Sequence, residues 1–246
     1  MGLDEKIVYI SDIDEDRFGI RTAKALKVTL DNLPQIIDFC RENKIKMLIA
    51  RCPTIDFPTI HAMEGEGFLL MDTLIYYSRD LTDTPIPSYT TKAIIRQIRS
   101  GEEHRVKEVA AESFRGYVGH YHADKRLDNS KCDEVYISWA SNLCLSPDFA
   151  DEVFVAELNG KILGFITLRI NNSAEGGGNL ACVDPSVRRM GIYRSLMIRK
   201  MEWSLSKGVR RMVVSTQVIN IAVQKTWVRL GFEPIRGYYT FHKWFD

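Results

Sequence analysis

Residues 180–193 read Leu180-Ala-Cys-Val-Asp-Pro-Ser-Val-Arg-Arg-Met-Gly-Ile-Tyr193. The apolar start predicts a short strand that Pro185 stops, and an amphipathic helix follows the basic loop. At such a junction the first N–H groups of the helix lack partners, and the helix dipole adds positive charge. Gly191 lets a ligand approach the backbone closely, and Arg188 and Arg189 add charge. The stretch predicts a pyrophosphate site, with a solvated basic turn as the alternative.

Strands and helices alternate on both sides of this stretch. Expected strands cover residues 7–10, 47–50, 68–77, 91–98, 153–157, 161–170, 180–183, 212–216 and 238–244. Expected helices cover residues 31–42, 57–66, 102–114, 133–143, 193–206 and 221–230, and residues 115–130 resemble an irregular loop. Asn159 and Gly160 predict a hairpin turn, because both tolerate positive φ. The alternation predicts an α/β fold with a mixed sheet.

A strand–helix–strand pattern occurs twice in the chain. Residues 47–50 precede Gly67-Phe68 and a strand, and residues 212–215 precede Gly231-Phe232 and a strand. The repetition suggests that the N-terminal part is a truncated copy of the C-terminal fold, with chance likeness as the alternative. Prolines 85 and 87 interrupt the apolar pattern between the copies. We therefore expect an N-terminal α/β domain at residues 1–80, a linker at 81–89 and a second domain at 90–246.

Composition excludes several classes of function. The 246 residues carry a formal net charge of +1, which is no basic excess for nucleic acid. No apolar run approaches the roughly 20 residues of a membrane span, and residues 1–10 lack an apolar signal core. Five scattered cysteines without a C-x-x-C pair argue against a zinc ribbon or a disulfide framework. We expect a cytoplasmic protein with no nucleic-acid or membrane partner.

The order Val183-x-Pro-x-x-Arg-Arg-x-Gly-Ile192, helix, strand, Asn220-Ile-Ala and Leu230-Gly-Phe resembles the GNAT acetyltransferase superfamily over residues 153–244. The resemblance implies a central, mixed and mostly antiparallel sheet flanked by helices, preceded by a truncated GNAT-like α/β domain. It also implies acetyl-CoA as co-substrate and no metal. The residues that it assigns to the pantetheine arm, the pyrophosphate and the rest of the cofactor are Ala181, Val183, Arg188, Arg189, Met190, Gly191, Ile192, Tyr193 and Asn220. Tyr193 departs from the small residue usual in the family.

Looser matches resemble the enzymes that acetylate nucleotide-linked 4-amino sugars, typified by dTDP-fucosamine acetyltransferase. Residues 16–20 resemble the Phe-Gly signature of their N-terminal domain, and residues 215–217 resemble the strand before their second cofactor helix. Residues 114–124 resemble their acceptor loop, which a helix with an aromatic residue follows. The residues assigned to acceptor binding on this ground are Arg115, Tyr117, His120, Tyr121 and Arg126. The resemblance implies a dTDP- or UDP-linked amino sugar for surface polysaccharide synthesis as the small-molecule substrate.

One position of the reaction departs from the family pattern. Counting from Asn220, the tyrosine that protonates the leaving thiolate is replaced by Trp227, whose indole N–H donates a hydrogen bond but no proton. Trp227 as a plain core aromatic is the alternative. Tyr239 is one candidate hydroxyl for the missing acid, beside Tyr238 and Tyr193. A thiol of pKa about 8.5 is a fair leaving group in any case.

The histidine segment admits three interpretations. His122 is a candidate acceptor of the amine proton, since histidine titrates near the right pH. His120, His122 and Asp124 would share one face if the segment were a strand, which would suit a metal, but the reaction needs none. Solvated loop histidines are the third possibility. Other functions left open are acetylation of a peptide N-terminus, an aminoglycoside or a polyamine, and CoA binding without catalysis. Related enzymes commonly pair through their sheets, so a homodimer is one assembly that the resemblance implies.

Overall fold

The computed structural model describes residues 6–145, 150–172, 174–178 and 180–245. The strands are β1 (Tyr9–Ile10), β2 (Thr22–Ala25), β3 (Met47–Pro53), β4 (Leu69–Asp80), β5 (Ile94–Gln97), β6 (Glu152–Leu158), β7 (Lys161–Ile170), β8 (Glu175–Gly177), β9 (Ala181–Val183), β10 (Arg211–Gln217) and β11 (Glu233–Trp244). The helices are α1 (Asp12–Phe18), α2 (Leu33–Glu42), α3 (Phe57–Gly65), α4 (Glu103–Phe114), α5 (His120–Ala123), α6 (Asn129–Leu145), the 3-10 turn η2 (Pro185–Val187), α7 (Ile192–Ser206) and α8 (Ile221–Arg229).

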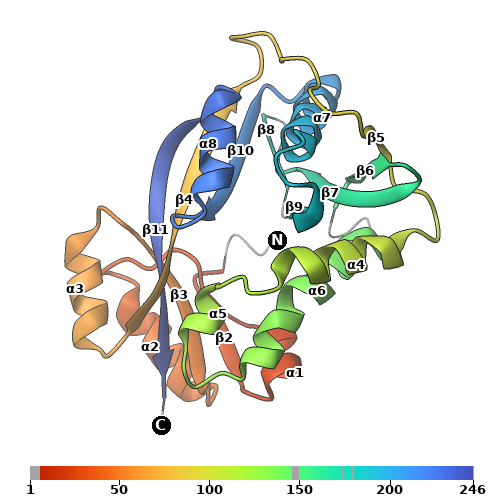
Figure 1. Cartoon of the computed structure of the whole chain (residues 1–246). Coiled ribbons are helices and arrows are strands. Elements are labelled where there is room, and N and C mark those ends of the chain that lie inside the picture. The colour runs from red at the N-terminus through yellow and green to blue at the C-terminus, as the bar shows by residue number, and fades with distance from the viewer. Residues whose placement is uncertain (1–5, 146–149, 173, 179, 246) are drawn as a thin grey trace.

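The described strands form one twisted, mixed sheet in the order β1-β2-β3-β11-β4-β10-β8-β7-β6-β5, with β9 paired to β7 off this path. Only β2 with β3 and β8 with β10 run parallel among the described pairs. β4 and β11 lie side by side through the middle and join the part with α2 and α3 to the part with α7 and α8 (Figure 1). The expected mixed, mostly antiparallel sheet flanked by helices is confirmed.

Four helices cover each face of the sheet. Tyr239 and Phe241 of β11 pack in the core under α2 and α3, and Tyr77 of β4 packs in the core under α7 and α8. Tyr239 pairs with Thr73, four residues before Tyr77, so these side chains share one face. The opposite face carries α1, α5 and α6 over Met47 and Ile49, and α4 with α6 over β6 and β7. The two faces therefore have separate cores.

The sheet contains a repeat with a two-fold arrangement. We call residues 27–80 (α2, β3, α3, β4) the first unit and residues 191–244 (α7, β10, α8, β11) the second unit. Adding 164 to a residue number of the first unit gives its counterpart: Met47 becomes Arg211, and α3 at Phe57–Gly65 becomes α8 at Ile221–Arg229. Tyr238 pairs with Leu74 at the centre, since 74 + 164 = 238.

The two units exchange their last strands. β11 lies between β3 and β4, and β4 lies between β11 and β10. The pair Trp244↔Met47 therefore has the counterpart Arg211↔Asp80. The repetition seen in the sequence corresponds to this structural repeat. One sheet crosses the expected linker at 81–89, so the division into folding units at 80 and 90 stays a prediction.

Most element predictions hold to within a few residues, and short elements were missed. α1 begins with three acidic residues and ends at Gly19 in the left-handed conformation (φ 67°), yet the sequence interpretation left it out. β2, β8 and α5 have four residues or fewer and form in tertiary contacts. The strand that would align His120, His122 and Asp124 is wrong, because residues 120–123 form the helix α5. No helix in the described ranges combines the length and apolar character needed to cross a membrane.

Candidate active site

The loop between β9 and α7 has the geometry of an anion site. Asp184 accepts hydrogen bonds from the N–H and the hydroxyl of Ser186 (2.8 and 2.6 Å), which forms the η2 turn. Arg189 (φ 68°) and Gly191 (φ 74°) then adopt left-handed conformations that turn the chain into α7. No side chain caps that helix at Gly191. The first N–H groups of α7 are thus available to a ligand.

Gly191 has a steric role as well as a conformational one. A Cβ atom at this position would lie 2.8 Å from the hydroxyl of Thr90, so a larger residue would clash. The charged side chains beside it are free to reach a ligand: Arg188 and Arg189 are exposed and form no ion pair with another described residue. Met190 is exposed too, whereas Ile192 is buried, so only its backbone can face the site.

β9 offers a free strand edge beside this loop. Ala181 and Val183 are half-buried, and β9 pairs with β7 along one edge only. β10 pairs with β4 and β8, and no register joins it to β9 in the part of the chain that the structure describes. The two strands therefore separate, which leaves backbone groups of β9 for an extended ligand arm.

Asn220 begins α8 without capping it. Its side-chain amide donates instead to the hydroxyl of Thr216 (3.1 Å). Its counterpart in the first unit is Asp56 (56 + 164 = 220), whose carboxylate accepts hydrogen bonds from the N–H and the hydroxyl of Thr59 (3.2 and 2.7 Å). The second unit thus has two helix starts, at α7 and α8, whose N–H groups no side chain occupies.

Trp227 contacts the start of α7 through Tyr193. The buried indole N–H donates a hydrogen bond to the Tyr193 hydroxyl oxygen (3.1 Å), and its ring meets Tyr77 edge-on at 5.4 Å. Because the tyrosine oxygen accepts this bond, its own proton is free to point elsewhere. Burial raises the pKa of Tyr193, so it stays protonated near neutral pH as a hydrogen-bond donor.

Tyr239 lies apart from this pair. It packs against Phe241 at 6.2 Å in the core under α2 and α3. No hydrogen bond or ring contact joins it to Trp227 or Tyr193 among the residues described. The structure therefore brings together two of the expected residues, Tyr193 and Trp227, and separates Tyr239 from them.

The two histidines of α5 have different surroundings. His122 is engaged at both ring nitrogens: the N–H of Gly119 donates to Nδ1 (3.2 Å), and Nε2 bonds to Asp133 (3.0 Å). His120 instead bonds through Nδ1 to Nε2 of the fully buried His242 (2.9 Å). His122 thus holds the start of α5, while His120 belongs to a longer chain of hydrogen bonds.

That chain ends on a buried carboxylate. Asp124 accepts hydrogen bonds from Nδ1 of His242 (2.7 Å) and the indole N–H of Trp244 (2.9 Å). Burial opposes its negative charge, but these bonds and one from the N–H of Arg126 (3.0 Å) outweigh it and lower the pKa of Asp124. We call Asp124, His242 and His120 the histidine relay. The described residues contain no group of three His, Cys, Asp or Glu side chains placed to hold a metal.

The expected acceptor residues do not all converge. Tyr117 packs with Phe114 and Tyr136, close to Asp72 in the sheet, whose charge adds to burial in raising the pKa of Tyr117 to about 12. Three others point elsewhere. Arg115 is exposed and pairs with Glu112, Tyr121 donates to the buried Asp14 (2.7 Å), and Arg126 stacks 4.0 Å over Trp244.

Four polar residues near His120 were missed in the sequence. We call Arg51, Asp72, Gln217 and Thr240 the polar cluster. Thr240 pairs with Arg51 on one side and with Asp72 on the other, so the three line up across β3, β11 and β4. Gln217 at the end of β10 donates to Asp72 (2.8 Å), and His242 lies two residues beyond Thr240 on the same face. A charged residue within an apolar strand, as in Leu69-Leu-Met-Asp72, was the available signal.

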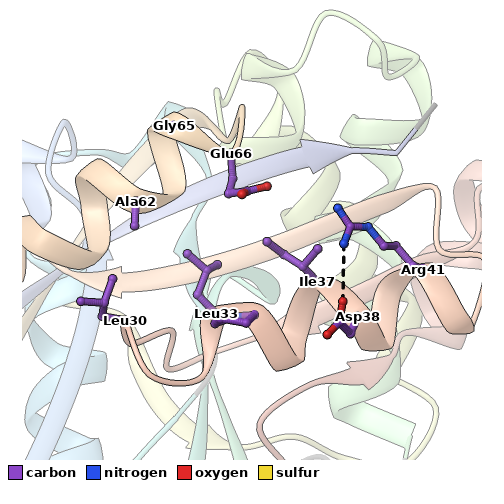
Figure 2. A pocket seen from close by; sticks show the side chains of 9 residues that line it. Leu30, Leu33, Ile37, Asp38, Arg41, Ala62, Gly65 and Glu66 are labelled. Atoms are coloured by element: carbon purple, nitrogen blue, oxygen red, sulfur yellow. Dashed lines mark hydrogen bonds and ion pairs between the residues drawn. The ribbon is translucent and has the colours of Figure 1, made fainter.

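A second hollow lies away from these residues. A groove of about 480 Å³ runs between α2 and α3, lined by Leu30, Leu33, Ile37 and Ala62 with the Asp38–Arg41 pair at its side (Figure 2). Ile37 and Ala62 have the counterparts Met201 and Thr226, so the groove corresponds to the space between α7 and α8 in the second unit. None of the expected site residues lines it.

Comparisons with known proteins agree on the fold. The chain is 25% identical over 144 residues to spore coat polysaccharide biosynthesis protein SpsD of Bacillus subtilis (strain 168), a match that spans 58% of this chain and 48% of that relative's length. A functionally unknown conserved protein from Staphylococcus epidermidis ATCC 12228 superposes with a TM-score of 0.66 at 13% identity, covering 97% of this chain and 90% of that one. A GCN5-related N-acetyltransferase from Sphaerobacter thermophilus gives 0.65 at 14% identity, covering 96% and 76%.

Residues 104–232, more than half of the 246, match the acetyltransferase (GNAT) family. The match takes in β9, the Gly191 loop, α7, β10 and α8, which are the elements that carry the open helix starts. The chain therefore belongs to the acetyltransferase (GNAT) family.

Proposed function

We propose that the protein transfers the acetyl group of acetyl-CoA to the amine of a small acceptor. The observation that carries this proposal is the pair of helix starts, α7 and α8, that no side chain caps. The pyrophosphate would bind the N–H groups from Arg189 to Tyr193 with Arg188 beside it. The pantetheine arm would pair with the free edge of β9 at Ala181 and Val183, and Asn220 would contact the cofactor from α8.

In this reaction the amine nitrogen attacks the thioester carbon. A C–N bond forms, the carbonyl oxygen becomes an oxyanion, and the C–S bond breaks to release the CoA thiolate. A backbone N–H on the separated edge of β9 would stabilise the oxyanion. Tyr193, whose oxygen accepts the bond from Trp227, would direct its own O–H toward the departing sulfur. Because the raised pKa of Tyr193 lies above that of a thiol, it would stabilise the thiolate and leave protonation to solvent.

The acceptor that we propose is a nucleotide-linked 4-amino sugar. Two things support it: the resemblance of residues 114–124 to the acceptor loop of such enzymes, and the similarity to a relative named for spore coat polysaccharide biosynthesis. That name is a property of the relative. A cytoplasmic location and a homodimer also stay predictions.

The direct test measures thiol release from acetyl-CoA with a dTDP- or UDP-linked 4-amino-4,6-dideoxy sugar, beside spermidine, an aminoglycoside and a short peptide. We expect release with the nucleotide sugar only. Release with another amine would replace the sugar assignment and keep the transferase. Binding of acetyl-CoA without release from any amine would contradict the catalytic proposal and favour a CoA-binding protein.

Trp227→Tyr tests the departure from the family pattern. If thiolate protonation limits turnover, the added phenol should raise kcat by about tenfold or more, within the range of general-acid effects. Tyr193→Phe should lower kcat and leave the Kd of acetyl-CoA unchanged, because it removes only the O–H aimed at sulfur. An unchanged kcat in both variants would exclude the Tyr193–Trp227 pair from the chemistry.

A further inference from the structure

We infer that the polar cluster of Arg51, Asp72, Gln217 and Thr240 binds the acceptor, an anionic amino sugar, and that the histidine relay accepts the proton from its amine. This inference rests on the proposed function and assigns its second substrate site. Most of this site comes from outside the segment that matches the family: Arg51, Asp72, Thr240 and His242 all lie before residue 104 or after residue 232.

The cluster contains buried polar atoms that no protein group satisfies. These atoms are Nε of Arg51, Oδ1 of Asp72, Oε1 of Gln217 and Oγ1 of Thr240. Thr240 is fully buried, and Gln217 is 4% exposed. Buried polar groups are nearly always hydrogen-bonded, because each orphan loses its hydration without compensation. Three of them lie in one row of paired strands, and the fourth belongs to Gln217, which is hydrogen-bonded to Asp72. Together they indicate a ligand that supplies the missing donors and acceptors.

The charges of the cluster indicate what that ligand carries. Arg51 forms no hydrogen bond or ion pair with a described residue, and it is not paired with Asp72 although Thr240 alone separates them in the sheet. A guanidinium left open in this way suits a phosphate or carboxylate, which it can bind with two parallel bonds. The free oxygen of Asp72 and the oxygen of Gln217 accept bonds and so suit hydroxyl or amine groups. A sugar that has hydroxyls, an amine and a phosphate meets all three requirements.

The hydrogen bonds of the relay determine which nitrogen of His120 is the base. The carboxylate of Asp124 can only accept, so Nδ1 of His242 carries a proton, and in the neutral form of that ring Nε2 has a lone pair. His120 must then donate from Nδ1, which leaves the lone pair on its own Nε2. No hydrogen bond to a described residue occupies that nitrogen, and His120 is half-buried. The relay thus holds His120 in the tautomer that can accept a proton.

The proton balance of the step is complete. Attack on the thioester places a positive charge on the acceptor nitrogen, and that N–H bond breaks as its proton moves to Nε2 of His120. Burial, His242, Arg51, Lys24 and His122 hold the pKa of His120 well below its usual range, so it is neutral before the attack. The Tyr121 ring packs against His120 with centroids 3.9 Å apart, and the Tyr136 hydroxyl lies close to the neighbouring Gly119. His120 would be the catalytic base, and His242 and Asp124 would be positioning residues.

Substrate kinetics with Arg51→Gln and Asp72→Asn test the binding part. The probes are dTDP-4-amino-4,6-dideoxygalactose and the methyl glycoside of the same sugar, which lacks the diphosphate. Arg51→Gln should raise the KM of the dTDP sugar by about tenfold or more and leave that of the glycoside unchanged, since charged hydrogen bonds are the strong ones. Asp72→Asn should raise both. The KM of acetyl-CoA should not change, and Arg41→Gln, an exposed arginine beside the α2–α3 groove, is the matched control.

A pH profile with His120→Gln tests the relay. We expect kcat/KM to fall by about a hundredfold, as loss of a general base typically does. Added imidazole should restore part of the rate, which a merely structural role would not allow. Asp124→Asn should move the acid limb of the profile by disturbing the tautomers, and His61→Gln, an exposed histidine on α3, should change nothing.

The outcomes separate this inference from the proposed function. If the wild type acetylates the sugar, either of two results would overturn the inference and keep the proposed function. These are an unchanged KM in both cluster variants, and no rescue of His120→Gln by imidazole. If no amine supports turnover, calorimetry with the dTDP sugar decides instead. Binding to the wild type that Arg51→Gln abolishes would support the site, and equal binding or none would overturn it, leaving water as the partner of the buried atoms.

Discussion

The two units share one architecture and differ at the starts of their helices. In the first, α3 is capped by Asp56, and both α2 and α3 have a proline in the first turn, Pro34 and Pro58, which removes a donor. In the second, α7 and α8 begin with Gly191 and Asn220, have no side-chain cap and have no proline in the first turn. The start of α3 is thus closed to an anion by its cap, whereas α2 has no side-chain cap, like α7 and α8, and differs from them by the proline in its first turn.

The two units also differ in the groove between their helices. The α2–α3 groove of the first unit is apolar and lies beside the Asp38–Arg41 ion pair (Figure 2). Its counterpart in the second unit has Tyr193 and Trp227 joined by a hydrogen bond, and Met63 occupies the position that corresponds to Trp227 (63 + 164 = 227). The two units share their arrangement of helices, and among the described residues the Tyr193–Trp227 hydrogen bond belongs to the second unit.

Gly191→Glu should have the largest effect, because it closes the start of α7 to an anion. The carboxylate adds negative charge where the pyrophosphate would bind, and its Cβ would collide with Thr90. We expect acetyl-CoA affinity to fall by about a hundredfold or more, measured by calorimetry. Gly208→Glu is the control, since Gly208 has the same left-handed conformation (φ 79°) with open space around it. Equal binding by both variants would remove the cofactor assignment.

Two contacts that are equivalent in the two-fold arrangement should contribute different amounts to the free energy of unfolding. Arg79 donates to the carbonyl of Leu230 at the end of α8, and Lys243 donates to that of Glu66 at the end of α3. Arg79 is buried and also bonds the carbonyls of Thr84 and Pro85. Arg79→Ala should lower the free energy of unfolding by about 3 kcal/mol and Lys243→Ala by about 1 kcal/mol in urea. Equal losses of unfolding free energy in the two variants would contradict the larger contribution expected of the buried contact.

Exchanging the residues that begin α3 and α8 should give each helix start the properties of the other. Asn220→Asp would place a carboxylate at the start of α8, where it can cap the helix and repel the cofactor phosphates. We expect about tenfold weaker acetyl-CoA binding. The reciprocal Asp56→Asn should leave binding unchanged and lower the free energy of unfolding by less than about 1 kcal/mol, since Asn also caps helices. Weaker binding in both variants would contradict the assignment of the site to the second unit.

A small effect of pH on stability should come from the histidine relay, to which only the second of the two units contributes, through His242, whose counterpart in the first unit is Ser78 (78 + 164 = 242). The pKa of His120 is lowered in the folded protein, so below about pH 6.5 the unfolded chain binds more protons. The free energy of unfolding should therefore fall between pH 7 and 5.5, by about 1 kcal/mol more in the wild type than in His120→Gln. An equal loss of unfolding free energy in the wild type and in His120→Gln between these two pH values, measured by urea denaturation, would contradict this.

The starts of α7 and α8 were more predictable from the sequence than the contacts around His120. The Gly191 loop and Asn220 are local signals, because a strand, a glycine and a helix follow one another along the chain. The contact between Tyr193 and Trp227, and the exchange of β4 and β11, join residues far apart, and no local pattern encodes them. Arg51 and Asp72 were missed for the same reason, since each is a single charge in a strand until the sheet aligns them.

The exchanged strands have a consequence for biosynthesis. β3 and β4 cannot close into a continuous sheet until β11 enters between them, and β11 emerges from the ribosome about 160 residues after β4. The amino-terminal strands must therefore wait, with their hydrogen-bonding edges open, while the rest of the chain is translated. Such a long delay before pairing favours slow maturation and reliance on chaperones. It also makes the entry of β11 the step that completes both halves together.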